Sequence, residues 1–273
     1  MKENEDLLLD AVNASLRAGE KILEVYNSEN FEVQYKSDKS PLTLADQNVD
    51  NLINEMLSTT SIPYFSEEGK KTPFEERSGW ERYWLVDPLD GTKEFIKRNG
   101  EFTVNIALIE KQIPVMGVVF VPVLRQLYFA EKQTGSYKIE NVNEKQFFSS
   151  FNKLLAGAKK IESNGVIKNL RIVGSRSHLS DETRDYFNML QQEYGEAEVV
   201  TKGSSLKICL VAEGKADIYP RLAPTMEWDT GAGHAIALYA GCSIIQFNSG
   251  ESLVYNKPDL LNPWFIVRSG AFR

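Results

Sequence analysis

Apolar residues recur in the first part of the chain at the three- and four-residue spacing of amphipathic helices. Between residues 7 and 26 they share one face, so we expect a long helix there. A second helix is expected after Thr43, which is placed to cap it, with Asp46 in its first turn. Asp46 has two interpretations, and the pattern leaves both open. It is either a first-turn acid that interacts favourably with the helix dipole and has no further function, or a residue that points into a site.

The pattern then changes to short apolar runs separated by proline and glycine. Residues 70–82 are charged without a clear period, which predicts a surface loop, and residues 93–98 have room for one helical turn. Closely spaced strands without helices between them indicate antiparallel pairing. Besides the run that ends at residue 86, these strands are expected at residues 103–109, 115–121, 126–131 and 135–139.

Residues 141–169 are polar and rich in lysine, which predicts a boundary between an N-terminal α+β subdomain (1–160) and a C-terminal α/β subdomain (161–273). Beyond it, strands and helices alternate, as in an α/β layer. The strands are expected at residues 170–173, 198–200, 216–219, 243–247 and 264–267, and the helices at residues 181–194, from Ser204 or Ser205 to residue 211, and at residues 230–239.

Composition and charge exclude several classes of protein. The net charge of −7 argues against a surface for polymeric nucleic acid, which needs a basic face. It is compatible with a small anionic substrate, because bound metal ions invert the local field. Cys209 and Cys242 lie in apolar surroundings and are expected to be buried without a disulfide. With no signal-peptide pattern and no apolar run long enough to cross a bilayer, we expect a cytoplasmic protein.

Two carboxylates, Asp87 and Asp90, directly follow an apolar run of strand type. Pro88 prevents both a ladder hydrogen bond and a continued helix, and Gly91 permits a tight bend. Two acids at the end of a buried strand are costly unless a positive group lies between them. Oxygen ligands of this kind suit Mg²⁺ or Mn²⁺ rather than zinc or copper.

Most pairs of acids with this spacing are solvated loop residues, but three neighbouring features favour a metal site here. The acids follow an apolar strand, Thr92 adds a hydroxyl, and a second acid pair, Glu67 and Glu68, follows another strand-like segment. The haloacid-dehalogenase phosphatases are an alternative, since their motif is Asp-x-Asp-Gly-Thr with a phosphorylated first aspartate. Here two residues separate the acids and proline follows the first, which disfavours that alternative.

A further acid, Asp229, precedes a segment of small residues that predicts a closely packed helix. An isolated aspartate in this position is simply a cap. A functional interpretation is also open, because free N–H groups at a helix N-terminus favour negative charge and receive phosphate well. His234, on the apolar helix, is expected to be structural.

Three segments together resemble the signatures of the inositol monophosphatase superfamily, and the resemblance extends over essentially the whole chain. This superfamily consists of Mg²⁺-dependent, lithium-sensitive phosphomonoesterases, so the resemblance implies a layered αβαβα sandwich of the inositol monophosphatase/fructose-1,6-bisphosphatase type. The three segments are Ser66-Glu67-Glu68, Asp87-Pro88-Leu89-Asp90-Gly91-Thr92 and Trp228-Asp229-Thr230-Gly231-Ala232-Gly233.

Within the superfamily, residues 83–105 and 203–207 are similar to the bacterial 3'(2'),5'-bisphosphate nucleotidases. The run Lys93-Glu94-Phe95 is the most distinctive part, because inositol phosphatases tend to carry a different run there. The family reaction converts adenosine 3',5'-bisphosphate and water to AMP and phosphate, and some members also act on 3'-phosphoadenosine 5'-phosphosulfate. Such enzymes clear a by-product of sulfate assimilation.

The resemblance also implies a metal centre of two to three Mg²⁺ ions, for which Mn²⁺ is a possible substitute. Glu67 and Asp87 would hold the first ion together with the backbone carbonyl of Leu89. Asp87 would bridge to a second ion held by Asp90 and Asp229, and a third, weaker ion would bind through Glu67 and water. Bound metal ions neutralise the phosphate dianion and lower the pKa of the attacking water.

The remaining site residues are likewise implied by the resemblance. Asp46 and Thr92 would form the catalytic pair that orients and deprotonates the attacking water, and Glu68 would support the ligands without touching the metal. Arginine can grip a phosphate at two points, whereas lysine acts as a point charge. The substrate contacts would be Gly91, Thr92, His178, Ser204, Lys207, Arg221 and Asp229.

Two alternative functions stay open at this stage. One is an inositol-phosphate or sugar-phosphate phosphatase of the same superfamily, and the other is a nucleotide-binding sensor without turnover. The sequence does not decide between the sulfated and unsulfated nucleotides, between monomer and homodimer, or whether the protein associates peripherally with the inner membrane.

Overall fold

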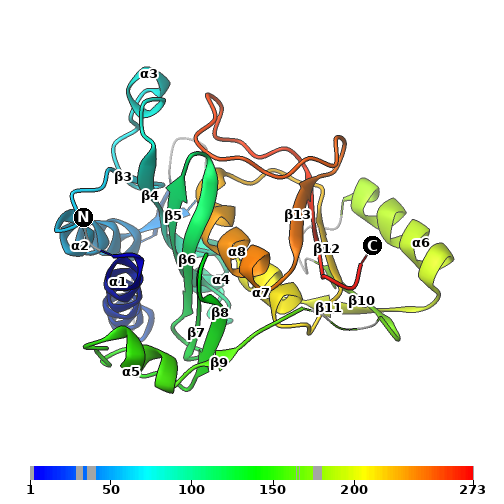
Figure 1. The fold of residues 1–273 in the computed structure, drawn as a ribbon, viewed down its shortest axis with the longest axis horizontal. Coiled ribbons are helices and arrows are strands. Elements are labelled where there is room, and N and C mark those ends of the chain that lie inside the picture. Colours follow the sequence, from blue (N-terminus) through cyan, green and yellow to red (C-terminus); the bar gives the residue numbers. More distant parts are fainter. Residues whose placement is uncertain are drawn as a thin grey trace.

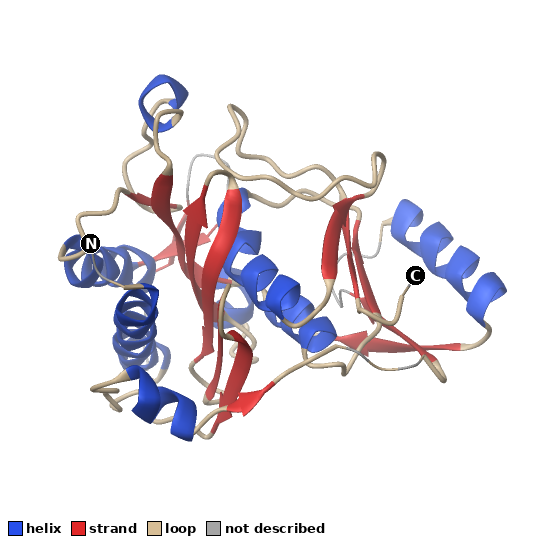
Figure 2. Ribbon diagram, in the orientation of Figure 1, coloured by secondary structure: helices blue, strands red, loops and turns tan. Residues whose placement is uncertain are grey.

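The computed structural model describes residues 3–28, 33–35, 41–163, 165, 167–174 and 180–272, with the backbone alone for residues 33–35 and 41–45. Within these residues the elements stack in five layers of helix, sheet, helix, sheet and helix (Figure 1; Figure 2). This arrangement is the αβαβα sandwich that the sequence resemblance implies.

The first helical layer consists of α1 (Asn4–Tyr26) and α2 (Leu44–Ser58), with α5 (Phe151–Ala156) beside α1 (Figure 1). The apolar face predicted for α1 is buried. Gly19 lies on this face, where an added Cβ would come within 2.2 Å of the Phe120 ring. A glycine here therefore lets the helix lie directly against the sheet.

In the described chain the first sheet has seven strands in the order β3-β4-β5-β6-β7-β8-β9. Only β3 and β4 pair in parallel, and the other neighbours are antiparallel, as predicted for the meander. The strands are β3 (Tyr64–Ser66), β4 (Arg82–Asp90), β5 (Thr103–Glu110), β6 (Ile113–Val121), β7 (Gln126–Glu131), β8 (Gly135–Glu140) and β9 (Lys159–Lys160), and a separate hairpin joins β1 (Val33–Tyr35) to β2 (Pro41–Thr43).

The middle helical layer, α7 (Leu206–Ala212) and α8 (Glu227–Tyr239), lies between the two sheets (Figure 1). α8 packs tightly on the first sheet, because a Cβ on Gly117 of β6 would come within 2.3 Å of the Ala232 carbonyl oxygen. One apolar cluster fills this layer and contains side chains from both halves of the chain. The two sheets on either side of residue 160 therefore share this core. The division of the chain into two subdomains at that residue stays a prediction.

The second sheet of the described chain has the order β11-β10-β12-β14-β13, and α6 (Asp181–Tyr194) covers its outer face (Figure 2). β10 pairs in parallel with β11 and β12, whereas β14 is antiparallel to β12 and β13. The strands are β10 (Leu170–Gly174), β11 (Ala197–Thr201), β12 (Ile218–Arg221), β13 (Ser243–Gln246) and β14 (Phe265–Arg268).

Three sequence predictions of elements were wrong. The expected surface loop at residues 70–82 contains α3 (Phe74–Arg77), whose Arg77 is buried and donates to Asn256 Oδ1. β4, expected to end at residue 86, continues to Asp90. α8 begins three residues before the predicted start at residue 230. The errors at α3 and α8 fall where polar residues are held by contacts that are distant along the chain.

Other predictions are confirmed by the described residues. Cys209 and Cys242 are buried and free. His234 is buried and its Nδ1 lies 2.9 Å from the Tyr255 hydroxyl, and burial lowers the pKa of its imidazole to about 4. None of the helices in the described part of the chain is long and apolar enough to span a bilayer.

Candidate metal centre and substrate cavity

Asp87 lies near the end of β4, where the strand leaves regular pairing. The β4–β5 register shifts between Asp87 and Asp90, so the chain bulges at the proline between them. The Asp87 carboxylate is 1% exposed, and its Oδ1 accepts a hydrogen bond from the Leu89 N–H at 3.0 Å. β4 thus runs through both acids to Asp90, with a bulge between them, instead of ending before them as predicted, and the bend follows at Gly91, where φ is +92°.

Glu67 reaches the same place because β3 runs parallel to β4. The Glu67 N–H donates to the Val86 carbonyl at 3.1 Å, which aligns the two acidic segments. Asp229 comes from the opposite side, in the first turn of α8, where its Oδ2 accepts the Met226 N–H at 2.8 Å. This helix start is held against β3 by Trp228 and Phe65, whose ring centroids are 6.2 Å apart.

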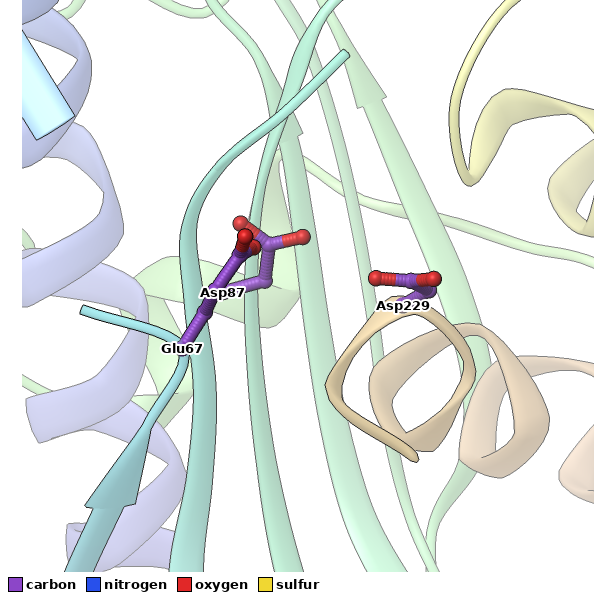
Figure 3. A group of neighbouring side chains, drawn as sticks. All are labelled: Glu67, Asp87 and Asp229. Carbon is purple, nitrogen blue, oxygen red and sulfur yellow. The ribbon is translucent and has the colours of Figure 1, made fainter. Parts of the chain in front are cut away.

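The three acids converge. Glu67, Asp87 and Asp229 each offer one carboxylate oxygen, and these oxygens all lie within 4.8 Å of one another (Figure 3). The β3–β4 pairing brings Glu67 to Asp87, which is 20 residues away, and the packing of α8 brings Asp229 to both from more than 100 residues away. We call this group the carboxylate cluster.

The electrostatics of the carboxylate cluster disfavour a purely anionic state. Burial, followed by the charges of Glu67, Asp90 and Asp229, raises the pKa of Asp87 well above its ordinary value. Burial, followed by the Asp90 charge, raises the pKa of Asp229 to about 8. A divalent cation would remove this repulsion, and a donor set made only of carboxylate oxygens fits a hard cation. The residues present therefore fit the metal centre that the motifs suggested.

Asp90 lies beside the cluster of three and not within it. Within the described chain, the hydrogen bonds that its carboxylate accepts all reach Oδ2, and the shortest comes from the Ser205 N–H at 2.7 Å. The Thr92 hydroxyl donates to the Leu89 carbonyl at 3.4 Å, so these two predicted site residues are neighbours.

Three predicted site residues are less directly placed. Asp46 is buried in the first turn of α2, and its pairing with Thr92 stays a prediction. Glu68 is half-buried and lines a separate cavity of about 510 Å³ with Asp50 and Tyr64. His178 lies outside the described residues.

Two adjoining cavities lie beside the carboxylate cluster. The acidic cavity, of about 430 Å³, is lined by Glu67, Asp87, Asp90 and Asp229 together with Leu89, Gly91 and Thr92. The basic cavity, of about 210 Å³, is lined by Ser204, Lys207 and Arg221. The residues that line both are Asp90, Gly91, Lys93, Glu94, Thr225 and Asp229.

Three cationic side chains line the basic cavity, and two of them, Lys207 and Arg221, are held there in different ways. Lys207 is 9% exposed, and its Nζ lies 5.8 Å from the centre of the Tyr219 ring. Arg221 donates from Nη2 to the Pro224 carbonyl at 3.0 Å, and its Nε is buried with no hydrogen-bond partner among the described residues. Both side chains thus line the wall of the cavity. From the sequence pattern alone, they could have been ordinary solvated cations on the surface.

Sequence reasoning missed the residues that support this arrangement. Thr103 and Asn105 on β5 approach Asp90 Oδ2 at 3.4 Å each. Glu101 is buried and accepts the Gly203 N–H at 2.9 Å. Two polar residues spaced by two in an otherwise apolar strand were an available signal, because both point to the same side of the sheet.

Comparisons with known proteins agree with this geometry. A model of the inositol monophosphatase family matches residues 3–269. The 3'(2'),5'-bisphosphate nucleotidase CysQ of Salmonella typhimurium is 45% identical over 254 residues, which cover 92% of this chain and 94% of that protein. The enzyme of the same name from Escherichia coli K12 is 42% identical and covers 95% of this chain and 99% of that protein.

Solved structures give the same result for the fold. The crystal structure of CysQ from Bacteroides thetaiotaomicron, a bacterial member of the inositol monophosphatase family, matches with a TM-score of 0.90 at 48% identity and covers 98% of each chain. The suhB protein of Bartonella henselae, at 20% identity and a TM-score of 0.72, covers 97% of this chain and 94% of that one, and supports the fold alone.

Proposed function

Because this chain belongs to the inositol monophosphatase family, we propose that it is a metal-dependent phosphomonoesterase that removes the 3'-phosphate of adenosine 3',5'-bisphosphate, giving AMP and phosphate. Its similarity to nucleotidases of this specificity covers nearly the whole chain. 3'-Phosphoadenosine 5'-phosphosulfate carries the same 3'-phosphate, and we propose it as a second substrate.

The observation that carries the proposal is the basic cavity beside the acidic one. A substrate with two phosphates needs a metal centre for one and a separate anion site for the other. Lys207 and Arg221 provide positive charge in the wall of the basic cavity. This cavity shares Asp90, Gly91 and Asp229 with the acidic cavity. A monophosphate such as inositol 1-phosphate would leave the buried Lys207 and the half-buried Arg221 without a phosphate partner, which disfavours that alternative.

The ligands proposed for the metal ions are Glu67, Asp87, Asp90, Asp229 and the Leu89 carbonyl. Magnesium is proposed because carboxylate and carbonyl oxygens are the donors it prefers. When bound, the ions neutralise the phosphate charge and acidify the attacking water.

The chain's own residues then supply orientation and proton transfer. Asp46 and Thr92 are proposed to align the water and receive its proton. Thr92 is suited to this role because its hydroxyl already lies at the edge of the acidic cavity, near Leu89. Ser204, Lys207 and Arg221 are proposed to hold the 5'-phosphate end, so that the 3'-phosphate faces the carboxylates.

The test is phosphate release from adenosine 3',5'-bisphosphate, AMP and inositol 1-phosphate, with Mg²⁺ and after chelation. Release from the bisphosphate alone, abolished by chelation, is expected. Preference for inositol 1-phosphate would keep the metal centre and refute the assignment of the basic cavity. Calorimetric binding of the bisphosphate without phosphate release would instead favour a nucleotide sensor.

A further inference from the structure

The carboxylate of Asp90 is restrained at one oxygen. Its Oδ2 accepts the Ser205 N–H at 2.7 Å and lies 3.0 Å from the Ser205 hydroxyl oxygen. Thr103 and Asn105 approach the same oxygen from β5 at 3.4 Å. A carboxylate oxygen has about two lone-pair sites, so Oδ2 is fully engaged by the protein. A metal ion in the acidic cavity is therefore left with Oδ1.

The Ser205 hydroxyl has two further neighbours, the Asp229 backbone and Asn105. Its oxygen lies 3.0 Å from the backbone carbonyl oxygen of Asp229 and accepts a hydrogen bond from Asn105 Nδ2 at 2.9 Å. Ser205 is 2% exposed and Asn105 is completely buried, so water does not substitute for these contacts. A serine hydroxyl has one proton, and the Asp90 carboxylate is a stronger acceptor for it than the Asp229 carbonyl.

The position of Ser205 is itself fixed by neighbouring residues. Ser204 has a φ of +50°, in the left-handed region, and its hydroxyl donates to the Asp90 backbone carbonyl at 3.0 Å. The buried Glu101 carboxylate holds the Gly203 N–H at 2.9 Å and Lys202 Nζ at 3.0 Å. The chain thus presents the Ser205 N–H and hydroxyl together to one oxygen of Asp90.

We infer that Ser205 is a positioning residue of the metal centre, which holds Oδ2 of Asp90 and so leaves Oδ1 for the cavity. The inference rests on the proposed assignment of Asp90 as a metal ligand. Ser205 acts through the Asp90 carboxylate and is not itself a proposed ligand. Hydrogen bonds of this kind fix the rotamer of a ligand, and their loss typically weakens metal binding about 10- to 100-fold.

The inference is tested with Ser205→Ala, which removes the hydroxyl and keeps the N–H donor. Ser136→Ala is the matched control, because Ser136 is equally buried and its hydroxyl donates to the Ile236 carbonyl at 2.7 Å, away from both cavities. Mn²⁺ binding to the chelator-treated proteins is measured from the electron paramagnetic resonance signal of free Mn²⁺. Steady-state phosphate release over a Mg²⁺ series, and thermal unfolding in chelator, accompany it.

Ser205→Ala is expected to bind Mn²⁺ roughly tenfold or more weakly than the unmodified protein. It should need correspondingly more Mg²⁺ for half-maximal turnover. At saturating Mg²⁺, its KM for substrate should stay within about twofold of that of the unmodified protein, because α7 keeps its backbone contacts. Ser136→Ala is expected to bind Mn²⁺ normally. Ser205→Thr, which restores a hydroxyl, should recover most of the Mn²⁺ affinity.

Mn²⁺ affinity in Ser205→Ala within twofold of the unmodified protein would overturn the inference, as would an equal loss in Ser136→Ala or a folded Ser205→Thr that binds as weakly as the alanine variant. Because Mn²⁺ binding needs no substrate, this result stands apart from the substrate test. An unmodified protein that binds Mn²⁺ normally but releases no phosphate from the bisphosphate would refute the proposed function alone.

Discussion

Replacing Asp229 by Asn should change how the stability of the metal-free protein depends on pH. The pKa of Asp229 is raised from its ordinary value of 3.8 to about 8, first by burial and then by the Asp90 charge. Between these values the folded chain binds a proton that the unfolded chain releases. Stability is therefore fully present at low pH and is lost as the pH rises toward 8.

The size of this loss follows from the shift. Each pH unit in this window costs about 1.4 kcal/mol, so between pH 6 and pH 8 Asp229 alone should cost about 2 kcal/mol. The raised pKa of Asp87 adds a loss of the same sign. Asparagine keeps an oxygen that can accept the Met226 N–H but carries no charge, so Asp229→Asn should show a pH slope that is shallower by about 1 kcal/mol per unit.

The measurement is urea unfolding in chelator at pH 6, 7 and 8, with Asp181→Asn as the control for an exposed first-turn acid. At each pH, the free energy of unfolding of Asp229→Asn is subtracted from that of the unmodified protein. Groups that titrate in both proteins then contribute equally and drop out of the difference. Parallel pH profiles for the two proteins would refute the argument. In excess Mg²⁺ the sign should reverse, because metal binding requires ionised ligands and so strengthens with pH.

Three further variants test other parts of the site. Asp90→Asn should reduce turnover by several orders of magnitude while circular dichroism still reports the native fold, and near-normal turnover would contradict the metal assignment. Lys207→Ala should raise KM for adenosine 3',5'-bisphosphate roughly tenfold or more with a smaller change in kcat, as measured by steady-state phosphate release; an unchanged KM would remove Lys207 from the substrate site. Gly91→Ala should destabilise by about 2 kcal/mol or more in urea unfolding, because φ is +92° and the new Cβ would lie 2.1 Å from the Ser204 Oγ. Gly79→Ala, at a position without a positive φ and with the nearest atom 3.9 Å from the new Cβ, should change the stability far less, and equal losses in both would contradict this reasoning.

Local sequence signals predicted most of the fold well. The meander strands have clear limits, because proline, glycine and polar turns separate apolar runs; β7 begins and ends at the predicted residues 126 and 131. The region containing α5 was missed because the helix has only six residues in a stretch that is otherwise polar, although Phe148, Phe151 and Leu154 stand three residues apart and are buried in the first core. Helical periodicity needs more turns than α5 contains.

The site could be predicted only as far as its motifs extend. The motif containing Asp87 and Asp90 was recognisable from the nine consecutive residues 84–92, whereas the restraint on Asp90 comes from Ser205, 115 positions later. Pairing over such a distance depends on how the two sheets and their shared helices pack, which no local pattern reports. The same limit applies to Asp46: its burial is a fact of the fold, and its role in proton transfer stays a prediction.

The carboxylate cluster joins the two halves of the chain. Asp87 lies in β4 of the first sheet and Glu67 directly follows β3, whereas Asp229 belongs to α8, which packs between the sheets. Repulsion among these carboxylates acts against the packing of α8 on β6, which is tight enough that Gly117 has no room for a side chain. A cation at the cluster would turn that repulsion into attraction, so metal binding and the docking of the two sheets should be energetically coupled.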